Sequence, residues 1–494
     1  MDIKKVVNII NKELNTNISS NYYSQIEEWR QWWAGYVKTF HRVMEMQENG
    51  RRQGRDLFSL RMAKKICEDW ATILLNEKTD ITVDNAAANE YLQGENGYSG
   101  ILKDLNFWQE ANTLVEKAFY SGTGAFVLKI DNLTATSSGN VKISSDANIR
   151  MEYLPAFCII PISKKYGKIT EAAFVSEHTE RGNKYIYLEI HTIENETYII
   201  ENRYYADKKG NYSPAPLPEG VVPRFDTGSS VPFFAIVSPN MVNPHKDNLG
   251  LGCAIFSEAI DNFKGVDLAF NNFCSDFKLG GKKVFYNREL TKTAGVNSEG
   301  QPIYLAPDDM MQQLFVSIGD ENLDDNKLIY EFNPSLRVED NQRGMQSQLD
   351  YLSFKCGLGT HYYQFSGTRG ASQVTATQYM GEKQELKQNA AKHGISIERA
   401  LQDIVKAILW VGKNIIGENI DPDAEITVSF ADGYVTSDQE RRIQDIQDIR
   451  DNIMQPWEYR VKWYSEDEET AKAVLADATK KVFGTLGYPT GEDE

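Results

Sequence analysis

The sequence predicts an α+β protein in which helical and strand-like segments occupy separate stretches of the chain. The first 120 residues have mainly helical patterns, and short β-rich runs follow from Phe119 to about Tyr205. Between Gly250 and Gly417 we expect a helix, a β-rich excursion of about fifty-five residues, a second helix, a glycine-rich loop and a long helix. Because neither end of this series forms a compact core alone, it favours a ring or bundle wall over the core of an enzyme.

Composition places the 494-residue chain among ordered globular proteins, because 41% of its residues are hydrophobic and 25% are charged. No apolar run approaches the roughly 20 residues of a membrane span, and the first five residues lack the apolar core of a secretion signal. The five cysteines are odd in number and form no CxxC pair. We therefore expect buried thiols in a reducing cytosol, without a zinc site, at Cys67, Cys158, Cys253, Cys274 and Cys356.

Aromatic residues recur at helical spacing near the N-terminus. We interpret this cluster as an amphipathic helix that buries its rings, and not as a base-stacking platform, because few basic residues interleave. A second helix is expected from Leu60 to about Leu75, with Ser59 as its N-cap, before a short strand from Ile81 to Val83. The aromatic cluster comprises Trp29, Trp32, Trp33, Tyr36 and Phe40.

The β-rich part contains one run with clear alternation, from Tyr185 to His191. Its aliphatic residues fall on one face, and its tyrosines, Glu189 and His191 fall on the other, as expected of a half-buried antiparallel strand. His178 and His191 have no third ligand at a supporting spacing. We therefore expect exposed strand histidines and not a metal pair.

The helix expected from residue 250 to 280 carries a near-heptad apolar stripe. Small residues accompany the stripe and permit close approach of a neighbouring backbone. We expect the stripe to pack against the second helix and against other copies of the chain. It comprises Phe256, Ile260, Phe263, Val266, Phe270, Phe273 and Phe277.

The excursion begins at about residue 280, with strand candidates at 284–286, 303–305, 314–318 and 328–332. The second helix follows from about Val338 and ends at Gly357 and Gly359. The long helix is expected to start near Ser372, where Thr375 to Gln378 resembles a capping box. Gly381 and Gly394 are expected to be weak or kinked points within it.

Catalytic motifs are missing from the sequence. It contains no GxxxxGK[ST] loop, no GxGxxG after a strand, no GxSxG elbow and no HExxH. The six histidines are scattered, and adjacent carboxylates such as Asp308 and Asp309 are interpreted as solvated loops. We therefore assign no catalytic residue, metal ligand or cofactor. An unrecognised intracellular hydrolase stays open as an alternative.

The net charge of −17 is concentrated toward the C-terminus. Residues 421–494 hold eighteen Asp and Glu against eight Lys and Arg, a net charge of −10. An acidic protein does not grip duplex DNA through a general phosphate-neutralising surface. Any contact with nucleic acid is therefore expected to be local or weak.

Several separated motifs, in the same order, make the chain similar to the portal proteins of tailed phages that infect Gram-positive bacteria. The resemblance extends from about residue 20 to 475, nearly the whole chain. The motifs are Ser59 to Ala71, Asn76 to Lys78, Asp276 to Gly280, Leu336 to Asp340, Lys355 to Phe365, Thr375 to Gln378 and Pro456 to Arg460.

This resemblance implies a dodecameric ring at one capsid vertex, through which DNA enters and leaves. It also implies a division of the chain into named parts. These are a wing with N-terminal helices and a β-rich part (1–249), a first stem helix (250–280), a clip (281–336), a second stem helix (337–357), a tunnel loop (358–371), a long kinked wing helix (372–417), a wing strand (418–437) and a helical crown with the C-terminal tail (438–494).

The resemblance further implies a structural protein of the virion, made in the host cytoplasm, without membrane association. Its partners would be other copies of itself, the large terminase subunit, a head-completion adaptor, scaffold and major capsid proteins, and double-stranded DNA. A monomeric minor capsid or interaction protein stays open as an alternative. The expected site residues are the tunnel-loop Ser366, Gly367, Thr368, Arg369 and Gly370, the candidate DNA-backbone contacts Lys278, Lys282 and Lys283, and the clip docking residues Asp320, Glu321, Asp324 and Asp325.

Overall fold

The computed structural model of the chain forms two compact units, Met1–Ser429 and Phe430–Glu494. None of the helices in the described part of the chain has the length and apolar character that a membrane crossing requires. The structure describes residues 2–46, 52–76, 79–94, 99–136, 139–144, 146–208, 210–286, 293–304, 315–317, 329–364, 376–430, 438–451, 453–464 and 466–475.

The helical N-terminal part packs around a buried aromatic core. Trp29 and Trp32 are buried, which confirms the amphipathic helix, whereas Tyr36 is 44% exposed. Ser59 does not cap the next helix. Arg61 with φ of 54° precedes that helix, and the Ser59 hydroxyl accepts the Arg61 N–H instead. The helices are α1 (Ile3–Leu14), α2 (Tyr22–Ala34), α3 (Lys38–His41), α4 (Met62–Leu74), α5 (Ala86–Gln93), α6 (Ile101–Asp104) and α7 (Phe107–Ser121).

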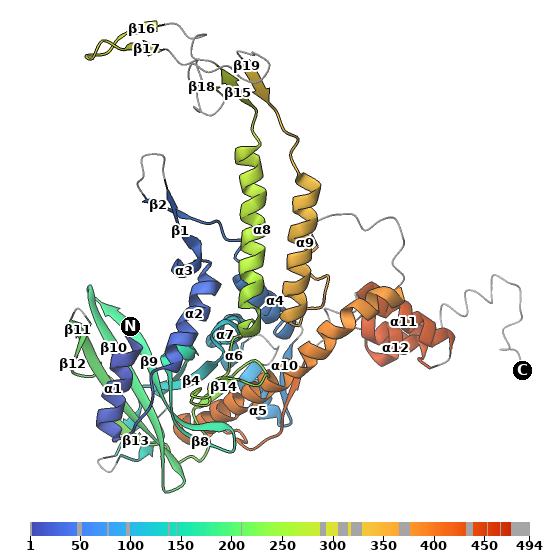
Figure 1. Cartoon of the computed structure of the whole chain (residues 1–494). Helices are drawn as coiled ribbons and strands as arrows, with labels where there is room; N and C mark the ends of the chain where they lie inside the picture. The colour runs from blue at the N-terminus through green and yellow to red at the C-terminus, as the bar shows by residue number, and fades with distance from the viewer. Residues whose placement is uncertain are drawn as a thin grey trace, which may run out of the picture. The chain divides into compact units, whose positions relative to one another are not determined.

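Two antiparallel sheets follow these helices (Figure 1). The smaller sheet has the order β14-β4-β7, with β4 (Gly124–Asp131) between β7 (Asn148–Pro155) and β14 (Phe234–Val237). The larger sheet has the order β12-β11-β10-β9-β8, and β13 also pairs with β11. Its strands are β8 (Ile159–Lys165), β9 (Lys168–Glu180), β10 (Asn183–Glu194), β11 (Thr197–Lys208), β12 (Asn211–Pro214) and β13 (Arg224–Asp226).

The prediction of a half-buried strand is wrong for β10, because residues 186–191 are buried on both faces. The smaller sheet covers the expected outer face: Lys129 of β4 reaches Glu189, and Phe234 of β14 lies against the His191 ring. His191 is therefore buried, in contrast to the expected exposed histidine, whereas His178 is exposed as expected.

Short strand pairs complete the first unit. A hairpin joins β1 (Arg42–Met46) to β2 (Arg52–Asp56), and β3 (Asp80–Val83) pairs with β20 (Ile426–Ser429). The expected strand near residue 81 is thus confirmed. The remaining pair consists of β5 (Thr134–Ala135) and β6 (Val141–Lys142).

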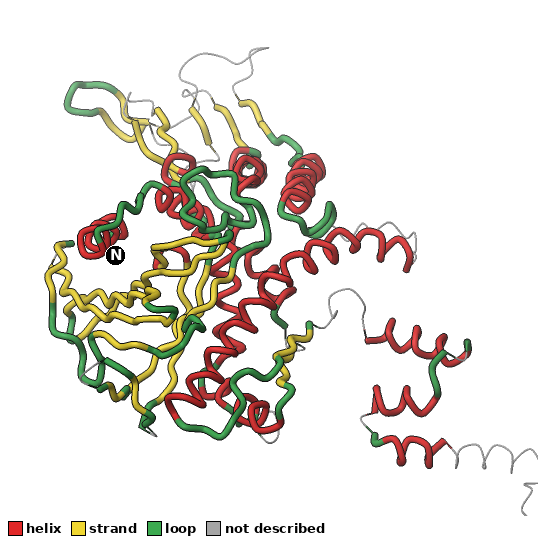
Figure 2. Tube along the Cα trace, turned by 90° about the horizontal axis from the view of Figure 1, so that it is seen from below, coloured by secondary structure: helices red, strands yellow, loops and turns green. Residues whose placement is uncertain are grey.

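Two long helices lie side by side in both views (Figures 1 and 2), α8 (Ile260–Leu279) and α9 (Val338–Lys355). The helix expected from residue 250 begins only at Ile260, after the 3-10 turn η2 (Ser257–Ala259). Residues 250–256 are irregular because the chain crosses its own backbone there: a Cβ on Gly252 would lie 2.3 Å from the Gly122 carbonyl oxygen. The long helix α10 (Ala376–Val411) ends in a π-helical turn, Gly412–Ile416.

The excursion between α8 and α9 contains a sheet of order β18-β15-β19, in which β15 (Lys283–Tyr286) pairs parallel with β18 (Phe315–Ser317) and antiparallel with β19 (Ile329–Phe332). These strands coincide with expected ones. A separate pair joins β17 (Pro302–Tyr304) to β16 (Thr293–Val296), a strand that the sequence did not predict because Gly295 lies within it.

The second unit contains α11 (Asp438–Arg450) and α12 (Pro456–Tyr464). Polar and cation–π contacts join them. Asp445 accepts a hydrogen bond from the Trp463 indole at 2.6 Å, and the Arg442 guanidinium lies 4.8 Å from the Trp463 ring centre. Among the side chains that the structure describes in this unit, Ala471 is the one buried apolar residue.

Candidate channel-forming helix pair

Polar contacts at one end and a close approach farther along join α8 and α9. Near the β15 end, the Asp276 carboxylate accepts hydrogen bonds from Arg337 at 2.7 Å and from Asn341 at 2.6 Å. These two donors hold the pKa of Asp276 below its ordinary value. Farther along, a Cβ on Gly265 would lie 2.5 Å from the Gln348 side-chain oxygen, so this glycine permits close approach of the two helices.

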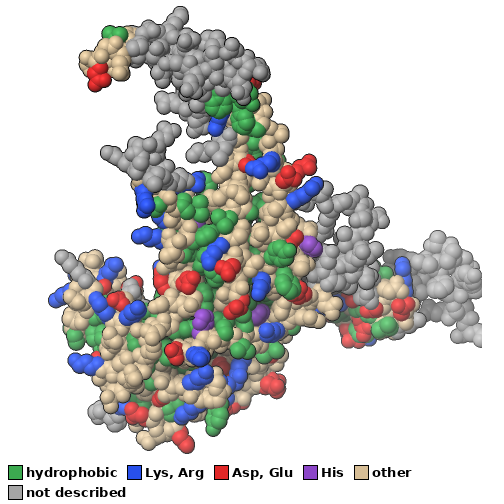
Figure 3. All heavy atoms as spheres, viewed as in Figure 1, with side chains coloured by type: hydrophobic (Ala, Val, Ile, Leu, Met, Phe, Trp, Pro, Cys, Tyr) green, Lys and Arg blue, Asp and Glu red, His purple; other side chains and the backbone are tan. Residues whose placement is uncertain are grey.

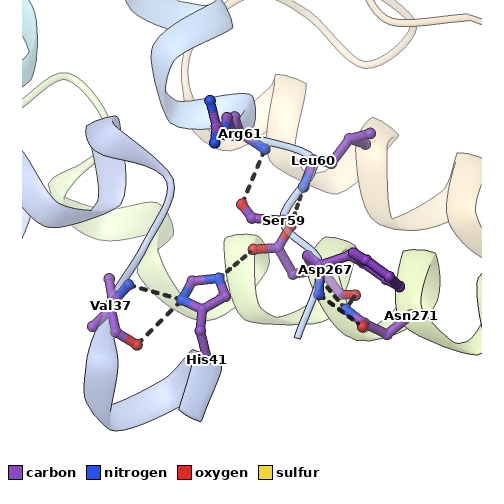
Figure 4. A network of polar contacts seen from close by, with 8 residues as sticks. Val37, His41, Ser59, Leu60, Arg61, Asp267 and Asn271 are labelled. Carbon is purple, nitrogen blue, oxygen red and sulfur yellow. Dashed lines mark hydrogen bonds and ion pairs between the residues drawn. The ribbon is translucent and has the colours of Figure 1, made fainter. Parts of the chain in front are cut away.

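A buried polar network fixes the other part of α8 to the N-terminal helices (Figure 4). The Val37 N–H donates to His41 Nδ1 at 2.8 Å, which leaves His41 Nε2 to donate to Asp267 at 3.1 Å. The second Asp267 oxygen accepts the Leu60 N–H at 2.7 Å. One turn later, the Asn271 amide binds both the N–H and the C=O of Phe58, at 3.0 and 2.7 Å. The network therefore sets how α8 is oriented on the rest of the first unit.

The predicted apolar stripe on α8 is buried only near the start of the helix. Phe256, Phe263 and Val266 are at most 3% exposed, and the Trp32 ring stacks on Phe263 at 5.9 Å. Toward β15 the stripe becomes uncovered, and Phe277 is 51% exposed. The buried part of the stripe thus contacts α2 of the same chain through Phe263, and the expectation that the stripe packs against the second helix and other copies stays a prediction.

Exposed apolar side chains also follow α9 and the outer face of α8. Leu349 and Leu352 are buried, but Tyr351 is 63% exposed, Phe354 is 52% exposed, and Leu268 on α8 is 50% exposed. Figure 3 shows hydrophobic side chains along this helix pair. Several large apolar side chains are thus left exposed on this one helix pair, as is typical of a surface that contacts other molecules.

The segment after α9 is firmly held up to residue 364. The Trp70 indole donates to the Cys356 carbonyl at 3.1 Å, and the Asn389 amide donates to Gly357 at 3.0 Å. Tyr363 donates to Asp69 at 2.7 Å, and burial raises its pKa well above the ordinary value. The expected tunnel-loop residues come directly afterward in the sequence. Ser366, Gly367, Thr368, Arg369 and Gly370 lie outside the described residues.

The candidate DNA-contacting cations have different surroundings. Lys282 forms an ion pair with Glu331 of β19 at 2.5 Å, whereas Lys283 begins β15 and is half-buried. The side chain of Lys278 is not described, although its backbone belongs to α8. The expected docking residues Asp320, Glu321, Asp324 and Asp325 lie outside the described part of the chain.

Sequence reasoning missed a buried charge network between the two sheets. The Lys129 amine lies 2.8 Å from Glu152 and 3.5 Å from Glu189, and His191 lies 2.7 Å from Glu189. Burial raises the pKa of Glu189, but Lys129 and His191 outweigh it and leave that pKa below its ordinary value. Lys129, Glu152 and Glu189 line part of a cavity of about 470 Å³. Alternation along one strand gives no sign of such pairing, because the cation comes from another sheet.

Residues of the kinds that ligate metals do not gather in the described ranges, where no group of three or more His, Cys, Asp or Glu is placed to hold an ion. The five cysteines are free thiols, and burial raises the pKa of both Cys67 and Cys356. Such thiols pack as small apolar groups and are poor nucleophiles.

The architecture thus defines a structural subunit with an α+β body and a projecting pair of helices that leaves apolar surface uncovered. The chain belongs to the family described as phage portal protein, SPP1 Gp6-like, whose model matches residues 13–473. No curated protein matches it. The resemblance to phage portal proteins is confirmed over nearly the same range. Members of this family are structural, non-enzymatic proteins of the virion that form homo-oligomeric rings and associate with the capsid.

Proposed function

We propose that twelve copies of the chain form a closed ring at one capsid vertex, with α8 and α9 in the wall of a channel for DNA packaging and ejection. The observation that carries this proposal is the half-exposed apolar surface of the helix pair, including Phe277 and Tyr351. Exposed apolar side chains do not stabilise a monomer, whereas packing against neighbouring copies removes these side chains from water. Heterologous contacts between copies generate a ring when the rotation from one copy to the next closes.

The dimensions of helices fit a channel for duplex DNA. Twelve helices at roughly 10 Å spacing give a circumference of about 120 Å and a diameter near 40 Å, which leaves a lumen of about 30 Å for a duplex of roughly 20 Å. The acidic balance of the chain, −17, suits this role, because a wall that attracted phosphate throughout would retard sliding. Local cations such as Lys278, Lys283 and Arg369 would make brief contacts with the DNA backbone.

The other parts of the ring would have separate tasks. The segment 281–336 would dock the large terminase subunit during packaging and a head-completion adaptor afterward, through Asp320, Glu321, Asp324 and Asp325. The scaffold and major capsid proteins would contact the wing, residues 1–249. The tunnel loop, 358–371, would constrict the channel. A Gram-positive host follows from the sequence resemblance and stays part of the proposal.

Electron microscopy and native mass measurement of the purified chain test the ring. Closed rings of about twelve subunits are expected, and a stable monomer at micromolar concentration under all conditions would contradict the proposal. Shortening Ser366 to Gly370 should leave rings intact but impair DNA retention or translocation. Unchanged packaging and retention in that variant would remove the tunnel-loop assignment while the ring assignment stands.

A further inference from the structure

The β1–β2 hairpin has an anchored base and exposed strands. Its two strands pair only with each other among the described strands, from Arg42 opposite Asp56 to Met46 opposite Arg52. Four of the five residues of β2 are exposed, and Met44 on β1 is 61% exposed. An isolated two-stranded hairpin is marginally stable in water, and both of its outer edges present unpaired backbone groups.

The base of the hairpin is held by the buried network that anchors α8 (Figure 4). His41 directly precedes β1 and donates to Asp267, and its carbonyl accepts the Leu57 N–H at 2.8 Å. Phe58, two residues after β2, is bound on both sides of its backbone by Asn271. Satisfied buried polar networks of this kind are specific and rigid. The hairpin therefore projects in a direction fixed relative to α8.

The hairpin region combines apolar and basic character. Phe58 and Met44 are each 61% exposed, and Tyr36, whose hydroxyl donates to Asp56 of β2, is 44% exposed. Residues 38–65, which include α3, the hairpin and the start of α4, carry eight Lys and Arg against three Asp and Glu, a net charge of +5 in a chain of −17; within them, residues 42–56 of the hairpin carry four against three. The rest of the chain therefore carries −22. Figure 3 shows Lys and Arg side chains over the described strands of the hairpin.

We propose that this hairpin docks on a second copy of the chain and forms part of the contact between neighbouring subunits; the inference rests on the proposed ring. A second copy offers the opposite charge that the cations in and beside the hairpin attract. It also offers cover for Met44 and Phe58, whose exposed apolar side chains gain little from a phosphate backbone. The position of the hairpin supports the same partner. His41 and Phe58, which flank the hairpin, are hydrogen-bonded to α8, the helix that the proposal places in the ring wall.

Hydrogen exchange on the full chain measures this docking directly. The assembled ring is compared with subunits dissociated from the same preparation by high salt, using peptides that cover 42–46 and 52–56. Amide exchange in these peptides is expected to slow at least tenfold on assembly, whereas the exposed turn at Arg181 and Gly182 should exchange equally in both forms. Rings with an unprotected hairpin would overturn the docking inference alone. Absence of rings would overturn both it and the proposed function.

Matched variants test whether assembly depends on the hairpin or on exposed surface in general. Arg52→Glu and Met44→Ser should each raise the subunit concentration at half-assembly by roughly tenfold. The controls Arg181→Glu and Tyr166→Ser make the same kinds of change at exposed positions elsewhere and should leave assembly unchanged. Thermal unfolding of the dissociated subunit shows that each variant folds. If Arg52→Glu instead weakens binding of a fluorescent DNA duplex and assembly is unaltered, the hairpin is a nucleic-acid contact and the inference is wrong.

Discussion

Two regions of the first unit differ in how completely the single chain buries its apolar side chains. Around Trp70, the helices α4, α7 and α10 enclose rings that are essentially inaccessible, and the Trp70 indole lies 5.1 Å from the His393 ring. Along α8 and α9, Phe277, Phe354 and Tyr351 are more than half exposed. The first region is complete in one chain, whereas the second leaves apolar side chains that the proposed ring would cover.

The two regions are expected to contribute to two different free energies, that of unfolding and that of association. Burial within one chain contributes to the free energy of unfolding of the subunit, whereas surface left exposed by the subunit contributes to association. Substitutions in the two regions should therefore be distinguished by measuring unfolding of the dissociated subunit and assembly of the ring separately. If substitutions in the two regions change subunit unfolding and ring assembly to the same extent, the two regions do not differ in this way.

Trp70→Ala is expected to have the largest effect on unfolding. It removes a fully buried ring and leaves the Cys356 carbonyl without its indole donor, so the free energy of unfolding should fall by about 3–5 kcal/mol. Urea denaturation of the dissociated subunit measures the loss. A fall below about 1 kcal/mol would show that the Trp70 region is not the stabilising core of the single chain.

Asp267→Ala tests the buried polar network that anchors α8 to the N-terminal part of the chain. The change leaves the His41 ring nitrogen and the Leu60 N–H without an acceptor, and should cost about 3 kcal/mol of unfolding free energy. Asp261→Ala on the same helix is the matched control. Its side chain is 92% exposed, so its effect should stay within about 0.5 kcal/mol. Equal losses in the two variants would argue against the anchoring role of Asp267.

The pH dependence of unfolding tests the closed core at His393. Burial lowers the pKa of His393 from 6.5 to about 4, and its Nδ1 accepts the Asn240 N–H. The unfolded chain therefore binds the proton more readily. This contribution to stability is complete above pH 6.5 and is lost as the pH falls toward 4, by about 2 kcal/mol between pH 7 and pH 5. Urea titrations at the two pH values measure this loss of unfolding free energy. The His393→Gln variant should lose less between the two pH values, and a loss equal to that of the unsubstituted chain would contradict this assignment.

Sequence periodicity predicted α4, α9, most of α10 and most of the strands between α8 and α9, because each has a local apolar pattern. The stripe from Phe256 to Phe277 was also identified correctly as one face of a helix over most of its length. The functional class required the order of several motifs across the chain. Periodicity alone shows which side chains avoid water and not which surface covers them.

The errors concern contacts between distant segments. His191 was expected to be exposed because one strand gives no sign of the second sheet that covers it. The start of α8 was placed too early because the crossing of Gly252 with Gly122 interrupts an otherwise helical pattern. The anchoring of α8 by His41 and Asn271 joins residues more than 200 positions apart, which no local pattern encodes.

Phe277→Ser should have the smallest effect on unfolding of the subunit and still weaken the ring. The Phe277 ring is 51% exposed and contacts Phe273 edge to face at 4.9 Å, so its loss should lower the free energy of unfolding by about 1 kcal/mol or less. Phe263→Ser on the same stripe is the matched comparison, because that ring is 3% exposed and stacks on Trp32. It should destabilise the subunit by about 3 kcal/mol or more. Sedimentation of dissociated and assembled protein measures both effects, and Phe277→Ser should yield a folded subunit that assembles poorly. Normal assembly of this variant would mean that the exposed end of α8 faces solvent or the channel in the ring and does not contact a neighbouring subunit.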